Sequence, residues 1–152
     1  HYQRPMLEDG VIEFETFWEP GVTEVHPCVG RSVVMISSDA AKLHQLTEAQ
    51  YESRELAIDN ESPIAGAAAP ELKSEDWNRV RLSLKGDQLT VSVNEKEIAT
   101  ITISEPPSER FFGLFRYSNK TASRVRNLRY RGEWPKTLPA IAEQVLAKPD
   151  GQ

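Results

Sequence analysis

The sequence has almost no cysteine and no long apolar stretch, and these absences exclude several classes of protein. Cys28 is the only cysteine in 152 residues, which rules out an intrachain disulfide and a four-cysteine zinc site. No apolar run approaches the roughly 20 residues that a helix needs to span a bilayer. A glycine-rich phosphate loop, a serine nucleophile elbow and a paired-cysteine motif are also missing, so none of these motifs suggests an activity.

An excess of positive charge is absent as well. The chain has 18 lysines and arginines against 23 aspartates and glutamates, a formal net charge of −5. We therefore expect neither nucleic acid as a partner nor insertion into a membrane. The chain begins at His1 rather than at a methionine, so we expect any targeting signal to lie upstream, in a larger multidomain protein. Of the compartments, an extracellular or periplasmic one is favoured.

What the sequence does contain is the period-two alternation of half-buried strands. Apolar and polar residues alternate from Asn78 to Lys85 and again from Leu89 to Val93, on either side of Gly86-Asp87. Two alternating runs around a short turn that contains glycine predict a β-hairpin. A third strand, Glu97 to Ile103, is rich in β-branched residues and follows a tight turn near Asn94.

Other segments complete an all-β pattern. Further strands are expected over Val11–Trp18, Arg31–Ser37, Lys42–Leu46, Arg110–Tyr117 and Ser123–Arg131. Arg110–Tyr117 is apolar on both faces and is expected to be a central strand, and a slip in the alternation predicts a bulge near Arg126-Asn127. Asn60–Asp76 is expected to be a surface loop. The predicted fold is an antiparallel two-sheet jelly-roll sandwich over residues 1–138, with a helical tail or linker over 139–152.

Two resemblances support this fold. Asp76-Trp77-Asn78, then Gly86-Asp87, then Val91-Ser92-Val93-Asn94 resemble the strand–turn–strand pattern of concanavalin A-like lectin and glucanase domains, which laminin-G-like modules share. Nearly the whole chain also resembles an uncharacterised domain of large planctomycete proteins, a domain of unknown function of the 1583 type. That resemblance rests on Glu24-Val25-His26-Pro27, Phe112–Tyr117 and Tyr130–Pro139. The first resemblance implies a fold, and the second brings no known activity.

A pair of glutamates is the only candidate for glycoside chemistry. Glu13 and Glu15 share one strand face and would lie roughly 7 Å apart. Inverting hydrolysis uses carboxyl groups about 6.5–9.5 Å apart. Glu19 would lie roughly 20 Å from Glu13, too far for either stereochemical outcome. The alternative interpretation of the pair is an ordinary solvated strand face.

The remaining candidates are side chains that suit sugar recognition. Trp18 and Tyr117 each close a strand beside polar residues, where an aromatic face can stack on a pyranose ring, whereas Trp77 is expected to pack in the core. His26 is expected in a polar loop, and His44 on a strand that faces the concave side of a sheet. For both histidines a structural role is the competing interpretation. Arg124, Arg126, Arg129 and Arg131 form a basic run that indicates either an acidic-glycan face or a charged edge strand.

The leading hypothesis is a non-catalytic module that binds a poly- or oligosaccharide and contacts other domains of its parent chain. Its ligand-binding residues would be Glu13, Glu15, Trp18, His26, Arg31, His44, Arg116 and Tyr117. A glycoside-acting enzyme that uses Glu13 and Glu15, and an interaction module without a small ligand, are the alternatives. The resembled domains sometimes carry calcium, but the sequence places no ligands for it and predicts no other cofactor.

Overall fold

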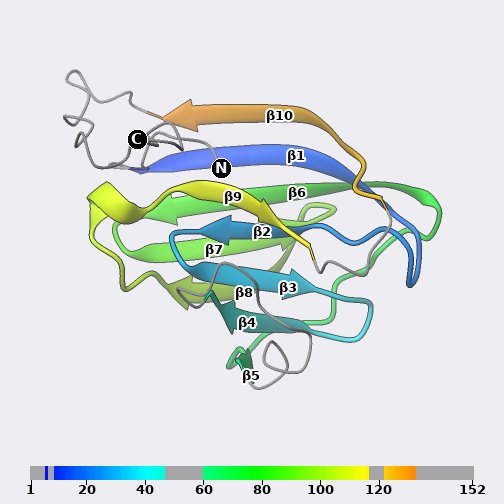
Figure 1. Ribbon diagram of the computed structural model, residues 1–152, viewed down its shortest axis with the longest axis horizontal. Coiled ribbons are helices and arrows are strands. Elements are labelled where there is room, and N and C mark those ends of the chain that lie inside the picture. Colours follow the sequence, from blue (N-terminus) through cyan, green and yellow to red (C-terminus); the bar gives the residue numbers. More distant parts are fainter. Residues whose placement is uncertain (1–5, 7–8, 47–59, 117–121, 133–152) are drawn as a thin grey trace, which may run out of the picture.

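The structure is a computed structural model, which describes residues 6, 9–46, 60–116 and 122–132. Within these residues, ten strands form two five-stranded antiparallel sheets, and Figure 1 shows the strands of both running along the long axis of the molecule. The strands are β1 (Gly10–Trp18), β2 (His26–Val29), β3 (Ser32–Ile36), β4 (Ala41–Gln45), β5 (Glu61–Pro63), β6 (Asp76–Lys85), β7 (Gln88–Val93), β8 (Lys96–Thr102), β9 (Phe112–Phe115) and β10 (Val125–Gly132). The only helix in the described part is the 3-10 turn Pro107–Glu109, and no described helix is long and apolar enough to cross a membrane. The predicted antiparallel sandwich is confirmed; the predicted helical tail lies outside the described residues.

The first sheet has the order β10-β1-β6-β7-β8, and its hairpins follow the predicted turn chemistry. Lys85 pairs with Gln88 across the turn Gly86-Asp87, where Gly86 adopts a φ of 61°. Val93 pairs with Lys96, and both residues of the intervening turn have positive φ, 48° at Asn94 and 70° at Glu95. Positive φ at both positions is what a type I′ turn requires, and that turn matches the twist of the flanking strands.

The predicted bulge in β10 is also confirmed. Glu13 of β1 pairs with Arg129, but Glu15 pairs with Arg126, so β10 carries one extra residue between these pairs. Asn127 lies in this bulge with a φ of 55°, a conformation that asparagine tolerates better than most residues. The bulge allows Arg126 and Arg129, three residues apart, to project from the same side of the sheet as the two glutamates.

The second sheet has the order β5-β4-β3-β2-β9, and three sequence predictions about it are wrong. His26 begins strand β2 and is buried rather than lying in a polar loop. Part of the predicted loop Asn60–Asp76 pairs with β4 as strand β5, and Asp76 already belongs to β6. The strand predicted over Arg110–Tyr117 is shorter and lies at the edge of the sheet as β9, because only one of its sides pairs, with β2.

The main core lies between the two sheets. Phe14 of β1, Leu82 of β6 and Val91 of β7 project from the first sheet and are at most 1% exposed. Val29 and Val34 project from the second sheet into the same core. The alternation of β1, β6 and β7 therefore sends every second side chain to the outer face of the first sheet, where the candidate site lies.

Candidate functional site

The two outer faces of the sandwich differ in accessibility. On the second sheet Cys28, Val33 and Met35 form a small second core with Phe115, and all three are buried. His44 lies on this face, is 0% exposed, and has its ring centroid 5.2 Å from that of Phe115. The centre of this face is therefore buried, although Lys42, on the same side of β4 as His44, is exposed.

His26 shares the buried face of the second sheet. It is 2% exposed, and its Nδ1 accepts a hydrogen bond from the backbone N–H of Ile36 at 3.0 Å. This bond joins the start of β2 to the end of β3, beyond the last backbone pair of the two strands. The contact is a structural one, and neither histidine reaches the face that carries the predicted glutamates.

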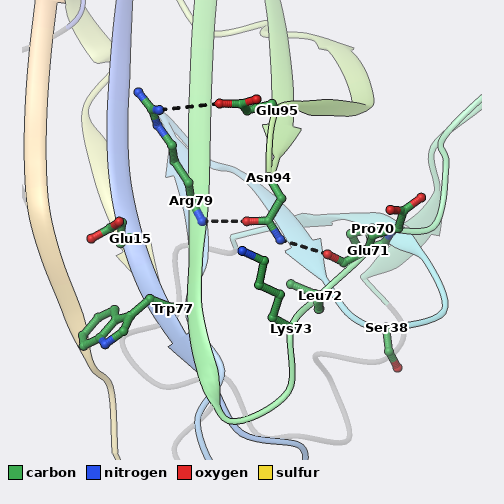
Figure 2. A pocket seen from close by; sticks show the side chains of 10 residues that line it. All are labelled: Glu15, Ser38, Pro70, Glu71, Leu72, Lys73, Trp77, Arg79, Asn94 and Glu95. Atoms are coloured by element: carbon green, nitrogen blue, oxygen red, sulfur yellow. Dashed lines mark hydrogen bonds and ion pairs between the residues drawn. The ribbon is translucent and has the colours of Figure 1, made fainter.

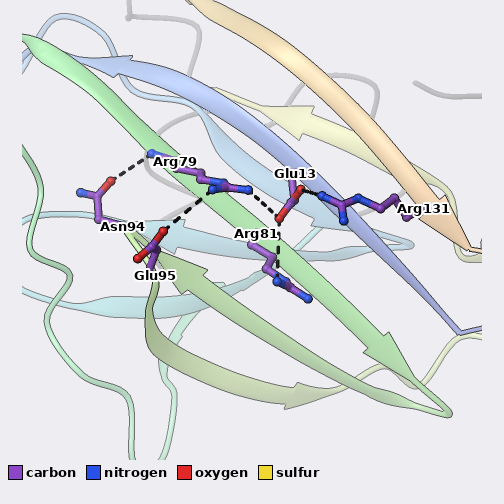
Figure 3. A network of polar contacts seen from close by, with 6 residues as sticks. All are labelled: Glu13, Arg79, Arg81, Asn94, Glu95 and Arg131. Atoms are coloured by element: carbon purple, nitrogen blue, oxygen red, sulfur yellow. Dashed lines mark hydrogen bonds and ion pairs between the residues drawn. The ribbon is translucent and has the colours of Figure 1, made fainter.

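On the outer face of the first sheet, Glu13 is surrounded by guanidinium groups (Figure 3). Its carboxylate lies 3.0 Å from Arg79, 2.7 Å from Arg131 and 3.8 Å from Arg81. Burial by itself would raise the pKa of Glu13, but the charges of Arg79 and Arg131 and their hydrogen bonds reverse this effect and lower it. Glu13 is therefore ionised at neutral pH and holds arginines of β6 and β10 across its own strand.

Glu15 continues the same row. It accepts hydrogen bonds from Arg126 Nε at 2.7 Å and from Asn127 Nδ2 at 2.6 Å, and these bonds lower its pKa. The guanidinium of Arg126 lies 3.9 Å above the ring centroid of Trp77, a cation–π contact. Phe17 meets the Trp77 ring edge-on at 5.6 Å. Trp77 thus lies on the outer face with a fixed orientation, which corrects its prediction as a core residue.

An open groove of about 910 Å³ adjoins this aromatic residue. Figure 2 shows its lining, which comes from β1, β6, the β3–β4 and β7–β8 turns and the segment before β6: Glu15, Ser38, Pro70, Glu71, Leu72, Lys73, Trp77, Arg79, Asn94 and Glu95. The lining is mostly polar and combines an indole ring with carboxylate, guanidinium, ammonium and amide groups. Such a combination is chemically suited to a sugar, whose apolar face can stack on a ring while polar groups take its hydroxyls.

Two asparagines hold the wall of the groove in place. Asn78 is fully buried; its Oδ1 accepts from the backbone N–H of Lys73 at 2.7 Å, and its Nδ2 donates to the carbonyl of Lys73 at 2.9 Å. Asn94 donates to Asn78 Oδ1 at 2.8 Å and to the carbonyl of Glu71 at 2.9 Å, and accepts from the backbone N–H of Arg79 at 3.0 Å. The Asp-Trp-Asn and terminal-Asn features of the sequence pattern therefore fix a loop against a hairpin, which is a structural task.

The structure does not bring the eight predicted residues together. Glu13 and Glu15 share the outer face of the first sheet, as predicted, while His26 and His44 are buried on the other sheet. Trp18 is half-buried and, by strand alternation, lies on the opposite side of β1 from Glu13 and Glu15. Arg31 is in the β2–β3 turn, where its Nε donates to the carbonyl of Leu46 at 2.9 Å. Arg116 is exposed just after β9, and Tyr117 lies outside the described residues.

Sequence reasoning missed Trp77, Arg79 and Asn94 as members of the groove. A signal for the first two was present, because Val80, Leu82 and Leu84 point inward, so the odd-numbered residues of the same strand must point outward. No such signal existed for Asn94, because its role depends on a loop that packs against the turn. Within the described ranges, no group of three or more histidine, cysteine, aspartate or glutamate side chains converges as metal ligands would.

Comparisons with known proteins agree with the fold. The model of a domain of unknown function, DUF1583_N, matches residues 1–137, so the chain belongs to this family. No curated protein is significantly similar in sequence.

Three solved structures share the architecture at low identity. Sheep galectin-11, solved in complex with glycerol, has a TM-score of 0.54 at 9% identity over 81% of this chain and 89% of its own. Galectin LEC-6 of Caenorhabditis elegans has a TM-score of 0.55 at 9% identity over 85% and 86%. A tetrameric galectin from the ball sponge Cinachyrella sp. has a TM-score of 0.50 at 18% identity over 82% and 92%. At these identities the likeness shows a galectin-like, and thus lectin-like, jelly-roll fold and nothing finer.

Proposed function

We propose that this chain is a non-catalytic carbohydrate-binding module of a larger protein, with its ligand in the groove beside Trp77. The observation that carries the proposal is the composition of that groove, where an oriented indole adjoins Glu15, Arg79 and Asn94. Phe17 and Arg126 already hold the ring in place, so binding would cost little side-chain entropy. The galectin-like fold supports a lectin-like role without identifying a sugar.

The electrostatics of the two glutamates favour binding over hydrolysis. Glycoside hydrolysis by a carboxylate pair needs one member protonated, with a raised pKa, to act on the leaving group. The pKa values of both Glu13 and Glu15 are lowered by arginine partners. Each carboxylate is also engaged by guanidinium groups that a catalytic acid would have to leave. The glycoside-acting alternative predicts that Glu13→Gln abolishes turnover of an accepted glycan.

A glycan array probed with the purified chain, with and without calcium, tests the proposal. We expect selective binding, and we expect Trp77→Ala to weaken it at least tenfold because the groove loses the one aromatic ring in its described lining. Trp18→Ala is the matched control, since it removes the same side chain from outside the groove. Circular dichroism checks that both variants fold.

Each outcome of the array bears on the proposal. Binding that survives Trp77→Ala but is lost in Trp18→Ala would move the site to the residue that the sequence favoured. Absence of binding to every glycan, with and without calcium, would overturn the proposal and leave the interaction module as the better interpretation.

A further inference from the structure

We infer that the outer face of β10, β1 and β6 selects glycans that carry acidic groups, namely carboxylate or sulfate along an extended chain. This inference rests on the proposed function and specifies its ligand class. The surface in question, called the arginine face below, is formed by Arg79, Arg81, Arg124, Arg126, Arg129 and Arg131.

The arginine face has the opposite charge from the chain as a whole. The protein carries a net charge of −5, yet the six arginines of this face surround Glu13 and Glu15 on the strand between them, and Arg79 has one further acidic neighbour, the exposed Glu95 at 3.9 Å. Neighbouring strands lie about 4.8 Å apart, so these positive charges reinforce one another within a Debye length of roughly 10 Å. The result is a local excess of positive charge on an acidic protein, which favours an anionic ligand at this face.

The ion pairs orient the arginines without using up their hydrogen-bonding capacity. Each guanidinium has five N–H donors, and a carboxylate such as Glu13 cannot satisfy those of three neighbours. The side chains of Arg79, Arg81 and Arg131 remain 49%, 54% and 69% exposed. The spare donors therefore face solvent in a fixed arrangement, which suits planar carboxylate and sulfate groups.

The geometry favours a chain over a small ion. Arg79 and Arg81, like Arg129 and Arg131, are two residues apart on a strand and so roughly 7 Å apart along it. Arg79, Arg81 and Arg131 meet at Glu13, but Arg126 lies at Glu15 and Arg124 over Phe17, so the positive charges continue along β1 and match repeated charges on a polymer. The row meets the proposed sugar groove at Arg79, which lines it, and at Arg126, which covers Trp77. One glycan chain can therefore occupy both.

The test compares acidic polysaccharides with their neutralised counterparts. Binding of polygalacturonate and of heparin is measured by calorimetry beside fully methyl-esterified pectin, desulfated heparin and a DNA duplex, at low and high salt. We expect at least tenfold tighter binding to an acidic chain than to its neutralised form, and a loss of this advantage at high salt. The two acidic probes separate carboxylate from sulfate as the preferred group.

Two variants assign the effect to the arginine face. Arg81→Gln and Arg129→Gln each remove a charge without touching the groove, and Arg81 makes the longest of the three contacts to Glu13, 3.8 Å. Each should weaken acidic-glycan binding about tenfold, as the loss of a charged hydrogen bond does, and leave neutral-glycan binding unchanged. Lys42→Gln, which removes an exposed charge from β4 on the other sheet, is the matched control and should change neither.

The outcomes distinguish this inference from the function on which it rests. Equal binding of acidic and neutralised glycans would overturn the inference and leave carbohydrate binding intact. Binding of DNA as tight as that of the best glycan would overturn it in favour of a general anion surface. Binding of no glycan at all would overturn both this inference and the proposed function.

Discussion

Truncating Asn78 is expected to be the most damaging single change at the groove, although Asn78 itself contacts no ligand there. Its side chain makes hydrogen bonds to the backbone N–H and carbonyl of Lys73, the carbonyl of Asp76 and the amide of Asn94, at 2.7–3.0 Å. A typical internal hydrogen bond contributes about 0.5–1.5 kcal/mol, and a buried partner left unpaired costs more. Because water can reach exposed Lys73, we expect Asn78→Ala to lower the free energy of unfolding by about 3 kcal/mol.

The measurement is urea denaturation, together with amide hydrogen exchange. A loss of about 3 kcal/mol should lower the thermal midpoint by roughly 6–12 °C in a chain of this size. The amide of Lys73 should exchange faster than in the unchanged protein, because its acceptor is gone. Asn60→Ala, in the turn before β5, is the control and should stay within about 0.5 kcal/mol. A loss below about 1 kcal/mol for Asn78→Ala would refute the assignment of Asn78 as the anchor of the groove wall.

Three further changes test other parts of the structure. Glu13→Gln should lower the free energy of unfolding at pH 7 by about 1–2 kcal/mol. The pKa of Glu13 in the folded protein is lowered from 4.5, so its charge stabilises the fold above pH 4.5 and this contribution fades as the pH falls further. Equal losses at pH 7 and pH 3 in urea titrations would contradict this reasoning. Glu95→Gly should stabilise the protein by about 1 kcal/mol in the same assay, because it relieves a φ of 70° and gives up only an exposed 3.9 Å contact with Arg79. Cys28 should resist iodoacetamide at pH 8 until the protein is unfolded, because burial and the charge of Glu105 raise its pKa to about 12. Rapid labelling of the folded protein, measured by mass spectrometry, would contradict this expectation.

Sequence alternation predicted those elements that have one wet face and failed for those that do not. Strands β6 and β7 follow a strict inward–outward pattern, so the hairpin and its turn were predicted correctly, although β6 begins at Asp76 rather than at Asn78. Strand β2 is buried at all four positions and contains a proline, so neither alternation nor propensity marks it. Strand β5 has three residues, which is too few for a period to be visible. The prediction that β9 is a central strand was wrong, because apolar residues on both faces show that both faces are covered by other residues and not that the strand pairs along both edges.

The candidate site was also predicted only as far as strand alternation reaches. Period two places Glu13 and Glu15 on one face, and the structure confirms this together with the bulge that brings Arg126 beside them. The burial of His26 and His44 was missed because no local pattern tells whether the outer face of a sheet is covered. His44 lies on such a covered face and is 0% exposed, although Lys42 and Gln45 of the same strand are exposed.

Strand β6 shows how one segment can carry both the fold and the proposed specificity. Its even-numbered residues, from Asn78 to Leu84, are buried and build the groove wall and the core, whereas Trp77, Arg79 and Arg81 project outward. Outward substitutions on a strand change stability little compared with inward ones. Outward residues of β6 can therefore be changed to alter the proposed ligand while Asn78 and the inward residues keep the fold. It follows that the proposed ligand preference must be tested at the outward residues of β6 and of its neighbours β1 and β10, not at the residues that build the fold.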